Sequence, residues 1–311
     1  MKRVLVVYYS QSGQLEHVAR TVAAPMQSAG HTVDFLKLEP VTPYPFPWTF
    51  WQFLDAFPES VALDPPALRA FQAQSRYDLI LLCYTAWFLS PAPPVTAFLK
   101  SAPGRALLRD TPVVTVSACR NMWVLAQEEV KKLLAQAGAR HCDHVSRVDP
   151  GHALATFITT PRWMLTGRRD AVWGLPPAGL RDSDIAGCAR FGRALAIALH
   201  EGTLDGARPV LSGLEAAKVD PALLASEAIG RRSFRVWSKL VRLAGPAGYW
   251  GRRPVLALYV VFLILMIITV VPVSLLLRAL LRPLLRERLE TRAALYERPS
   301  GSGSERMREF T

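Results

Sequence analysis

VLVVYYSQSGQLEHVA, residues 4–19, joins a run of apolar residues to a short polar loop and then to a helical pattern. The apolar run stops at Tyr9, and five small or polar residues follow. Apolar side chains then return at the three- and four-residue spacing of one helix face, at Leu15, Val18 and Ala19. The stretch therefore predicts a buried strand, a tight loop and a helix. The loop is either a phosphate-binding loop or only a polar turn.

The same alternation continues through residue 200. Continuous apolar runs predict further buried strands, and amphipathic runs predict helices between them. The expected strands are residues 2–9, 31–38, 77–84, 111–118 and 140–148. The expected helices are residues 14–28, 67–74, 95–100, 123–137 and 182–200. Apolar strands that alternate with amphipathic helices predict an α/β fold, with a parallel sheet covered by helices on both faces.

Composition narrows the class of protein. The 311 residues are 50% hydrophobic and carry a net charge of +12, and a mean hydropathy of +0.17 indicates a membrane-associated part. Residues 1–200 contribute 20 basic against 15 acidic side chains, and residues 201–311 contribute 17 against 10. The four cysteines form no CxxC pair and no zinc-type cluster, so no metal site is expected and a reducing compartment is favoured. No signal-peptide pattern precedes the first strand.

Two segments interrupt the repeat. Residues 40–66 hold seven aromatic side chains among prolines, and residues 150–180 combine tryptophans with arginines. We interpret them as an aromatic insertion and a loop insertion in a domain formed by residues 1–200. Long loops in a compact domain are often lids or binding loops, and the alternative is a packed surface loop without a binding role.

The C-terminal third has a different character. Residues 201–253 are predicted to be a basic helical linker, and residues 255–277 carry no charge over 23 positions, which is long enough to cross a bilayer. We therefore predict a transmembrane or membrane-embedded helix at 254–278, with a basic helix and a polar, disordered tail at 279–311. Whether the helix spans the bilayer or dips into one leaflet is left open. A cytoplasmic domain on a bacterial-type inner membrane is the expected location.

The candidate site follows from sheet geometry. Ligands of open parallel sheets bind at the carboxyl ends of strands, so the loops after the first, third and fourth strands should share one crevice. The first loop offers hydroxyls, a glycine and a helix N-terminus, which favour an anion. It has neither the lysine of a Walker loop nor a GxGxxG pattern, so a phosphate monoester suits it better than a nucleoside triphosphate. Its hydroxyls could equally cap the helix.

The other two loops carry rings and donors. Residues 85–91 include an aromatic pair that could stack on a flat ring, and residues 119–123 supply a cation, an amide and an indole. Packing in the core and ordinary surface exposure are the alternatives for these side chains. Three such loops at one sheet edge indicate a site more strongly than any one loop does.

Two segments of the sequence resemble flavodoxin-like proteins. VLVVYYSQSGQLEHVA is similar to their first strand and phosphate loop, and TAWFLSPAPPVTAFLK looks like the segment after strand three in flavodoxin-like quinone reductases. The resemblance implies a flavodoxin-like doubly wound five-stranded parallel sheet in the order 2-1-3-4-5, and FMN as cofactor. It implies that cofactor binding involves Ser10, Gln11, Ser12, Gly13, Gln14, Leu15, Thr85, Ala86, Trp87, Phe88, Cys119, Arg120, Asn121 and Met122.

A narrower resemblance concerns the flavodoxin-like domain with a CRNMW loop, an aromatic insertion and a C-terminal apolar helix. This combination looks like membrane-anchored flavodoxin-like proteins named dialkylresorcinol condensing enzyme. The sequence also departs from electron-carrier flavodoxins, which are usually acidic, whereas residues 1–200 have a net charge of +5.

Three hypotheses for the function are consistent with these features of the sequence. The first is a membrane-tethered FMN oxidoreductase that passes reducing equivalents from NAD(P)H to an apolar acceptor such as a quinone or a lipid-like aromatic precursor, with Arg120 as the catalytic cation. The second is a flavodoxin-type electron carrier that docks on a membrane partner, and the third is a cofactor-free scaffold. A thiol-dependent condensing enzyme would use Cys119 with His141, His144 or His152, although their spacing gives no specific signal.

The expected partners follow from these hypotheses. Membrane lipid is expected to bind through residues 255–277 and through the basic run at 231–253. An apolar small molecule is the expected substrate. No nucleic acid is expected, and a homodimer is left open.

Overall fold

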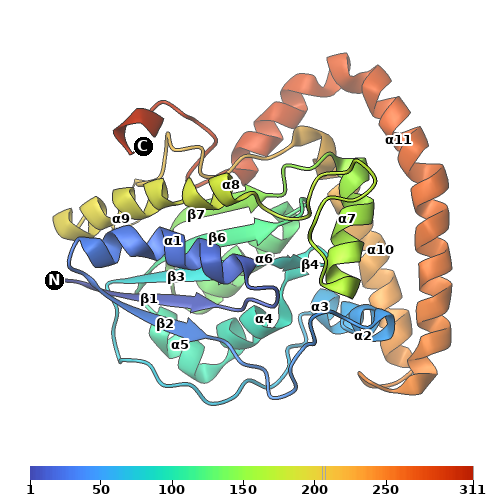
Figure 1. Ribbon diagram of the computed structural model, residues 1–311, viewed down its shortest axis with the longest axis horizontal. Helices are drawn as coiled ribbons and strands as arrows, with labels where there is room; N and C mark the ends of the chain where they lie inside the picture. The colour runs from blue at the N-terminus through green and yellow to red at the C-terminus, as the bar shows by residue number, and fades with distance from the viewer. Residues whose placement is uncertain (205, 207, 311) are drawn as a thin grey trace.

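The computed structural model describes the backbone of residues 1–204, 206 and 208–310, and Figure 1 shows its elements. Within these ranges, the side chains of residues 153, 154, 270–272 and 274–285 are outside the description.

Five parallel strands form the central sheet, in the order β2-β1-β3-β6-β7. Their bounds are β1 Arg3–Tyr8, β2 Thr32–Lys37, β3 Leu79–Tyr84, β6 Pro112–Cys119 and β7 Arg140–Val148. Numbered among themselves, these strands have the order 2-1-3-4-5, which is the flavodoxin-like topology. The predicted fold class and strand order are confirmed. The order reverses between β1 and β3, so a crevice is expected at their carboxyl ends.

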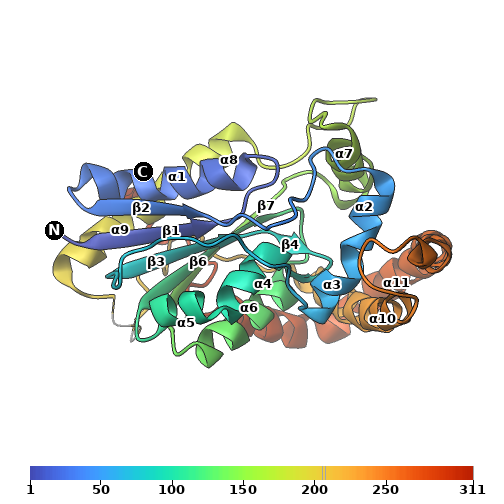
Figure 2. The ribbon, with the colours of Figure 1, turned by 90° about the horizontal axis from the view of Figure 1, so that it is seen from below.

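Helices cover both faces of the sheet, as Figure 2 shows. One face packs against α1 Gln14–Ser28, α8 Asp182–Ala186 and α9 Ala189–Glu201, and the other against α4 Pro93–Lys100, α5 Ala102–Leu108 and α6 Val124–Gln136. Helices α1 and α9 approach closely at Gly192, where a Cβ would lie 2.1 Å from the Val22 carbonyl oxygen. Strand β3, buried along its whole length, lies at the centre of this core.

The two insertions contain helices that the sequence patterns did not indicate. Residues 40–66 include α2 Phe50–Asp55 and α3 Phe57–Ala62, and residues 150–180 include α7 Ala153–Thr166. By contrast, the helix predicted at 67–74 is wrong. That segment is extended and pairs with the insertion through the isolated bridge Pro40↔Leu68. A two-stranded hairpin, β4 Ala86–Trp87 with β5 Ser90–Pro91, follows β3.

The C-terminal third folds against this domain. Its elements are η1 Pro221–Leu223, α10 Leu224–Leu243, η2 Trp250–Arg252, α11 Arg253–Tyr296 and η3 Met307–Glu309. The helical stretch Trp250–Thr269 is long and apolar enough to cross a membrane. The remainder of the predicted membrane segment, residues 270–278, has described side chains only at Val273.

The last residues differ from the expected disordered tail. Helix α11 continues to Tyr296, and the segment after it packs on the domain. Ser300 is 1% exposed and Phe310 is 7% exposed. The amide N–H groups of Glu215 and Ala217 donate to the carbonyl oxygens of Gly303 and Gly301, over 2.7 Å and 3.0 Å. These contacts bring the C-terminus beside α9 (Figure 1).

Candidate functional site

The loop after β1 places the N-terminus of α1 at the carboxyl edge of the sheet. Gly13 is the N-cap of α1 and adopts a left-handed conformation, with φ +85°, which glycine adopts without steric cost. Nothing lies within 4 Å of the position that a Cβ of Gly13 would take. Ser12 and Gly13 are exposed, whereas the Leu15 side chain is buried in the core. The loop therefore presents backbone N–H groups and open space to solvent.

The hydroxyls of this loop have different roles. The Ser10 hydroxyl accepts a hydrogen bond from the Glu16 backbone N–H at 3.2 Å, so Ser10 caps the first turn of α1. Ser12 remains on the exposed side of the loop. Glu16 is the acidic residue of the first turn, and its carboxylate pairs with Arg20 at 2.8 Å. The Arg20 guanidinium lowers the pKa of Glu16. Ser12 is thus the more exposed of the two serines, and Ser10 is half-buried.

Two glutamines join this loop to both insertions. The Gln11 amide donates to the Pro45 carbonyl at 2.6 Å and accepts from the Trp48 indole at 3.0 Å. The Gln14 side chain accepts from the Leu180 N–H at 3.2 Å and donates to the Leu180 carbonyl at 3.4 Å. Both residues are predicted to bind cofactor, and in the structure their side chains form hydrogen bonds within the chain. They hold residues 40–66 and 150–180 beside the loop.

The loop after β3 carries its aromatic pair into two different clusters. Trp87 contacts Tyr9, Tyr44 and Trp48, with ring centroids 6.0, 5.2 and 5.4 Å away in edge-on geometry. Phe88, at φ +49°, turns instead toward Phe53 and Phe57. Burial raises the pKa of Tyr44 to about 12, so its hydroxyl is protonated at neutral pH. Trp87 therefore lies beside the loop after β1, and Phe88 belongs to the packing of α3.

Thr85 and Ala86, the other two residues of this loop that are predicted to bind cofactor, form backbone contacts within the chain. The Thr85 carbonyl accepts from the Ala92 N–H at 3.0 Å, and Ala86 pairs with Pro91 in the hairpin. Both residues are half-buried.

The loop after β6 carries Arg120 under α7. The Arg120 Nε donates to the Thr156 hydroxyl at 2.7 Å, and its guanidinium carbon lies 4.1 Å from the centroid of the Phe157 ring. Burial lowers the pKa of Arg120, and the nearby Asp149 carboxylate raises it. Because the pKa of a guanidinium lies far above neutral pH, Arg120 stays charged at neutral pH. The sequence predicted that Arg120 lies near a flavin, but it did not predict the contacts of Arg120 with α7.

Asn121 and Met122 open onto a cavity. Its volume is about 470 Å³, and its other walls come from the start of α6, the end of β7 and residues 215–227. Met122 has φ +51°, a strained value for a side chain of its size. A second cavity of about 620 Å³ lies at the opposite edge of the sheet, beside Lys2, Asp78 and Pro112. The first cavity is the one that adjoins the predicted flavin loop.

The contacts of Cys119 do not favour a nucleophilic thiol. Its sulfur lies 4.0 Å from the Arg147 carbonyl, and burial raises the pKa of the thiol. A catalytic cysteine requires the opposite shift. The hydroxyl of Thr115 lies within 3.0 Å of His141 Nε2 and within 2.9 Å of His144 Nδ1, so both imidazoles are held by a residue other than Cys119.

These histidines belong to a buried polar chain that sequence reasoning missed. The Tyr84 hydroxyl donates to Gln127 at 2.6 Å, and the Gln127 amide donates to the Thr115 hydroxyl at 3.0 Å. Burial lowers the pKa of His141 to about 4 and that of His144 well below its ordinary value. The chain of neutral groups links β3, α6, β6 and β7 behind the candidate site. Polar residues within the apolar strand sequences, such as Thr115, were the feature of the sequence that could have indicated this chain.

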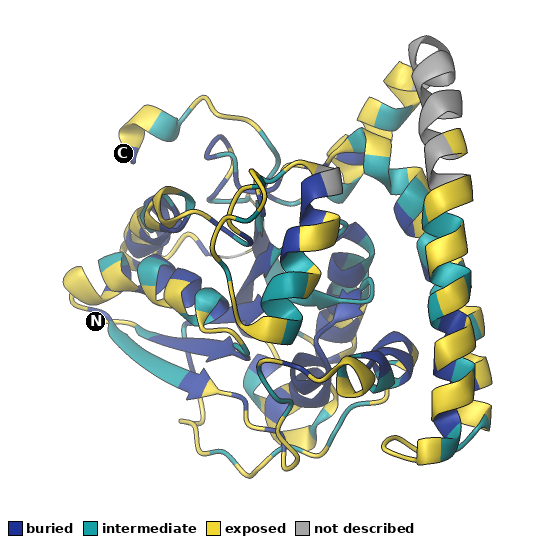
Figure 3. Ribbon diagram, turned by 45° about the vertical axis from the view of Figure 1, so that its right-hand side comes forward, coloured by how far each residue is buried: buried dark blue, intermediate teal, exposed yellow. Residues whose placement is uncertain are grey.

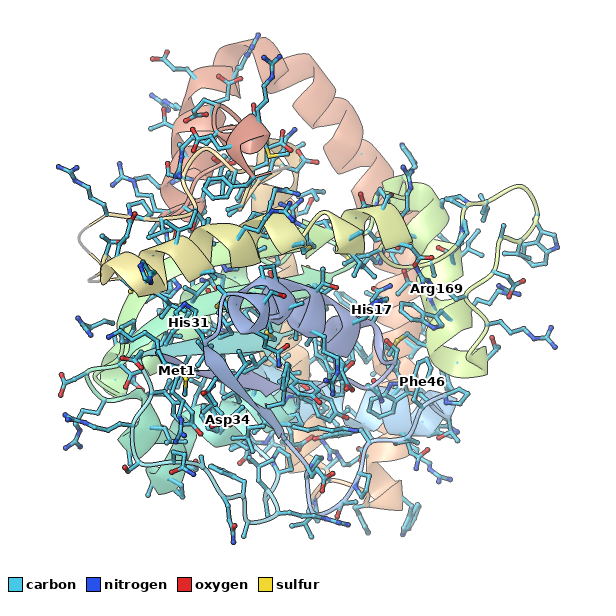
Figure 4. The ribbon with its side chains drawn as sticks, turned by 60° about the vertical axis from the view of Figure 1, so that its left-hand side comes forward. Met1, His17, His31, Asp34, Phe46 and Arg169 are labelled. Carbon is cyan, nitrogen blue, oxygen red and sulfur yellow. The ribbon has the colours of Figure 1, made fainter. Side chains whose placement is uncertain are left out.

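The two insertions cover the carboxyl edge of the sheet together. The backbone N–H of Trp48 donates to the Met164 carbonyl at 2.8 Å, and the Phe46 and Trp163 rings meet edge to face at 6.2 Å. In Figure 4, Phe46, Arg169 and His17 lie toward one end of the molecule, and Met1, His31 and Asp34 lie toward the other. The predicted loops thus meet at one edge, beneath a layer built by both insertions. In the described part of the chain, no group of His, Cys, Asp and Glu side chains could hold a metal ion.

Comparison with known proteins gives structural likeness only. A flavoprotein in complex with FMN from Lactobacillus acidophilus is 16% identical, with 47% of this chain and 93% of that chain covered at a TM-score of 0.40. A flavodoxin from the domain Archaea is 12% identical, with 64% and 99% covered at 0.36. Flavodoxin 1 from Bacillus cereus is 14% identical, with 61% and 94% covered at 0.34. At such values the likeness adds no argument to the topology already described.

No family model matches the sequence, and no curated protein matches it. What can be said of the ligand and the reaction therefore rests on the residues of the site.

Proposed function

We propose that the chain binds FMN at the carboxyl edge of β1, β3 and β6, and that it passes reducing equivalents from NAD(P)H to an apolar acceptor at a membrane. The observation that carries the proposal is the exposed, left-handed Gly13 at the start of a 15-residue helix, beside the ends of the two strands where the order reverses. A helix N-terminus with free space before it is suited to a phosphate group.

The phosphate end of this site fits the cofactor. Ser12 and Gly13 are exposed, the space beside Gly13 is open, and the Glu16 carboxylate is neutralised by Arg20. The loop carries no lysine, so its contribution is that of backbone N–H groups and a hydroxyl together with the helix dipole. Because a dianionic phosphate repels carboxylates, the pairing of Glu16 favours binding.

The ring end of the site is shaped by Trp87. This indole offers a surface for a flat ring, and the rings of Tyr44 and Trp48 are packed against it. Tyr44 and Trp48 belong to the insertion that Gln11 holds, and together with Trp87 they would hold the flat ring of the cofactor at this end of the site. FMN, when bound, supplies the hydride and electron chemistry, and the protein positions it.

Arg120 is the cation of the site. Its guanidinium lies against the Phe157 ring and is half-buried, so its charge is less screened than that of a surface arginine. We assign to it the stabilisation of negative charge that develops on a reduced ligand. The cavity beside Asn121 and Met122 has the size of a small-molecule site, and we place the acceptor there.

The charge of the domain bears on the alternatives. The positive charge of the domain favours an enzyme over a mobile carrier with an acidic docking face. A carrier remains the second candidate, because the same site could exchange electrons with a membrane protein. A role with dialkylresorcinol-type substrates stays a prediction that rests on the sequence resemblance, and the cofactor-free scaffold is the third candidate.

One experiment separates these functions. The full chain is purified in detergent, its absorption spectrum is recorded with and without added FMN, and NADPH is then added without oxygen. We expect a bound flavin spectrum that bleaches on NADPH addition. Bound flavin without bleaching would indicate the carrier. Colourless protein with no affinity for FMN would overturn both flavin hypotheses.

A further inference from the structure

The beginning of α11 is fixed to the domain by buried contacts. Arg252, which is 0% exposed, lies 3.1 Å from an Asp55 carboxylate oxygen and 3.0 Å from Glu59. Tyr259, which is 1% exposed, stacks on Phe57 with ring centroids 4.6 Å apart and ring planes at 2°. The first turns of the apolar helix are therefore part of the protein core around α2 and α3.

The end of α11 is fixed to the same domain. Ala293 is 4% exposed in a cluster with Trp123 and Val219. The Glu297 carboxylate accepts from the Val219 N–H at 2.9 Å. Figure 1 shows the helix bent between these two attachments, so that its ends reach different sides of one domain.

The residues after α11 strengthen this second attachment. The Ser300 hydroxyl donates to Asp143 at 2.8 Å and accepts from the His144 N–H at 2.7 Å, while Arg193 donates to the Phe310 carbonyl. Asp143 and His144 lie on β7, and Arg193 lies on α9. The C-terminal segment is thus bonded to the sheet and to one of its covering helices.

These attachments decide how the helix can meet a bilayer. A crossing takes about 20 apolar residues, and α11 has 44 residues, enough in length for one crossing and part of a return. A second crossing, back through the whole bilayer, is excluded by sequence, because residues 278–296 carry seven charged side chains. With both ends of α11 on one domain, a single crossing is excluded as well.

The outer face of the helix is nevertheless apolar and exposed. Leu258, Val261, Leu265 and Ile268 are between 53% and 66% exposed and follow the spacing of one helix face. Figure 3 shows this exposed face along α11, turned away from the sheet. On α10, the apolar Val236 and Leu240 are exposed between arginine and lysine side chains, an arrangement typical of helices that bind an anionic lipid surface.

We propose that α11 enters one leaflet of a membrane and returns, so that the whole chain lies on one side of the bilayer. The proposal deepens the membrane attachment proposed above and does not depend on flavin binding. Four of the seven basic residues at 231–253 are exposed, namely Arg232, Arg235, Lys239 and Arg253, and these would contact the headgroups. The other three are ion-paired within the chain: Arg231 with Glu129, Arg242 with Asp64, and Arg252 with Asp55 and Glu59.

Labelling of single cysteines tests the topology. Ser304→Cys reports on the C-terminal segment and Ser75→Cys on the sheet domain, because both positions are exposed. Each variant is expressed in a bacterium and treated with a membrane-impermeant maleimide, in spheroplasts and in inverted vesicles, with the unsubstituted chain as background. We expect both positions to be labelled in inverted vesicles and neither in spheroplasts. Labelling of Ser304→Cys in spheroplasts would show a crossing and overturn the proposal.

A matched pair of substitutions tests the insertion itself. Leu265→Lys places a charge on the exposed face of α11, and Ile197→Lys makes the same change at a similarly exposed site on α9. After a 1 M salt wash, which leaves a Debye length of about 3 Å, we expect Leu265→Lys to lower the membrane-bound to soluble ratio at least about tenfold. Ile197→Lys should leave the ratio unchanged. Equal ratios for both variants, complete release of the unsubstituted chain by salt, or a soluble dimer would each overturn insertion.

Discussion

At the residue scale, the loop between β1 and α1 separates two serines that look equivalent in the sequence. Ser10 is used by the fold, because its hydroxyl caps the Glu16 N–H, whereas Ser12 faces solvent beside the open space at Gly13. Ligand binding at this loop is therefore expected to depend on Ser12, and helix stability on Ser10.

The substitution Ser12→Asp tests the phosphate position. A carboxylate within about 4 Å of a phosphate costs about 1 to 4 kcal/mol, depending on the local dielectric. We expect the affinity for FMN to fall at least about tenfold, with the melting temperature unchanged. Titration of FMN followed by flavin fluorescence measures the effect. Ser75→Asp, at the opposite edge of the sheet, is the control, and equal affinities in the two variants would contradict the phosphate assignment.

Glu227 provides a second test at the residue scale. Its carboxylate accepts from the Leu125 N–H at 2.6 Å at the start of α6, and burial raises its pKa to about 7 while Arg231 lowers it. Between an unfolded pKa of about 4.3 and the folded value of about 7, the folded state binds more protons than the unfolded state. The stability contributed by this group is therefore present at low pH and is lost as the pH rises through that window.

We expect the free energy of unfolding of the native chain, relative to that of Glu227→Gln, to fall as the pH rises from 4.5 to 7. The comparison with the variant is needed because His141, whose pKa is lowered to about 4, shifts stability in the opposite direction over part of this range. Urea unfolding at a series of pH values measures the difference. A difference that does not change with pH would show that Glu227 titrates normally.

At the element scale, the strands were predictable and the insertions were not. A buried strand in a parallel sheet is a continuous apolar run, and such runs were found at β1, β3 and β6. The strand order came from the resemblance to flavodoxin-like proteins. Helix α7 lies in a segment with a proline inside it, and α2 and α3 are six residues each, too short for a helical period to stand out. Tertiary contacts, such as those of Gln11 and Gln14, determine where these elements lie.

Contacts between distant parts of the chain also limited how much of the candidate site could be predicted. The sequence predicted which three loops meet, because that depends on strand order alone. It could not show that α7 covers Arg120, or that Trp87 is packed by Tyr44 and Trp48, because these contacts join positions far apart in the chain. The polar composition of residues 297–310 likewise gave no sign that Ser300 would bond to Asp143.

The contact between η2 and α3 provides a prediction at the element scale. Removal of one partner from a buried ion pair costs about 3–5 kcal/mol, because the remaining charges are left without compensation. We therefore expect Arg252→Ala to lower the free energy of unfolding by about that amount. Its neighbour Arg253 is exposed and lies 5.8 Å from the centroid of the Trp51 ring, so Arg253→Ala should cost less than about 1 kcal/mol.

Chemical denaturation in detergent measures both variants. A loss for Arg252→Ala no larger than that for Arg253→Ala would mean that the first turn of α11 is not anchored through this pair. The one-sided topology would then lose one of its two supports.

At the scale of the whole molecule, the candidate site and a surface of exposed apolar side chains lie in two different regions. The sheet domain carries the candidate site at its carboxyl edge, and α10 and α11 carry a row of exposed apolar side chains. Figure 3 shows the exposed residues along α11. Because α3 and α10 are in contact through Ser238 and the Pro58 carbonyl at 2.7 Å, the aromatic insertion lies between the two regions. An acceptor dissolved in a membrane would reach the site from this side.

The return of the chain to β7 changes where the domain ends. Because Ser300 is bonded to β7 and Phe310 to α9, α11 is an internal segment of the sheet domain and not an appendage after it. A fragment that stops before the apolar helix would lose the segment that lies on β7, and would leave the Asp143 carboxylate without its hydroxyl partner. A soluble form of this protein would have to be made by excising the helix and rejoining the chain on either side of it.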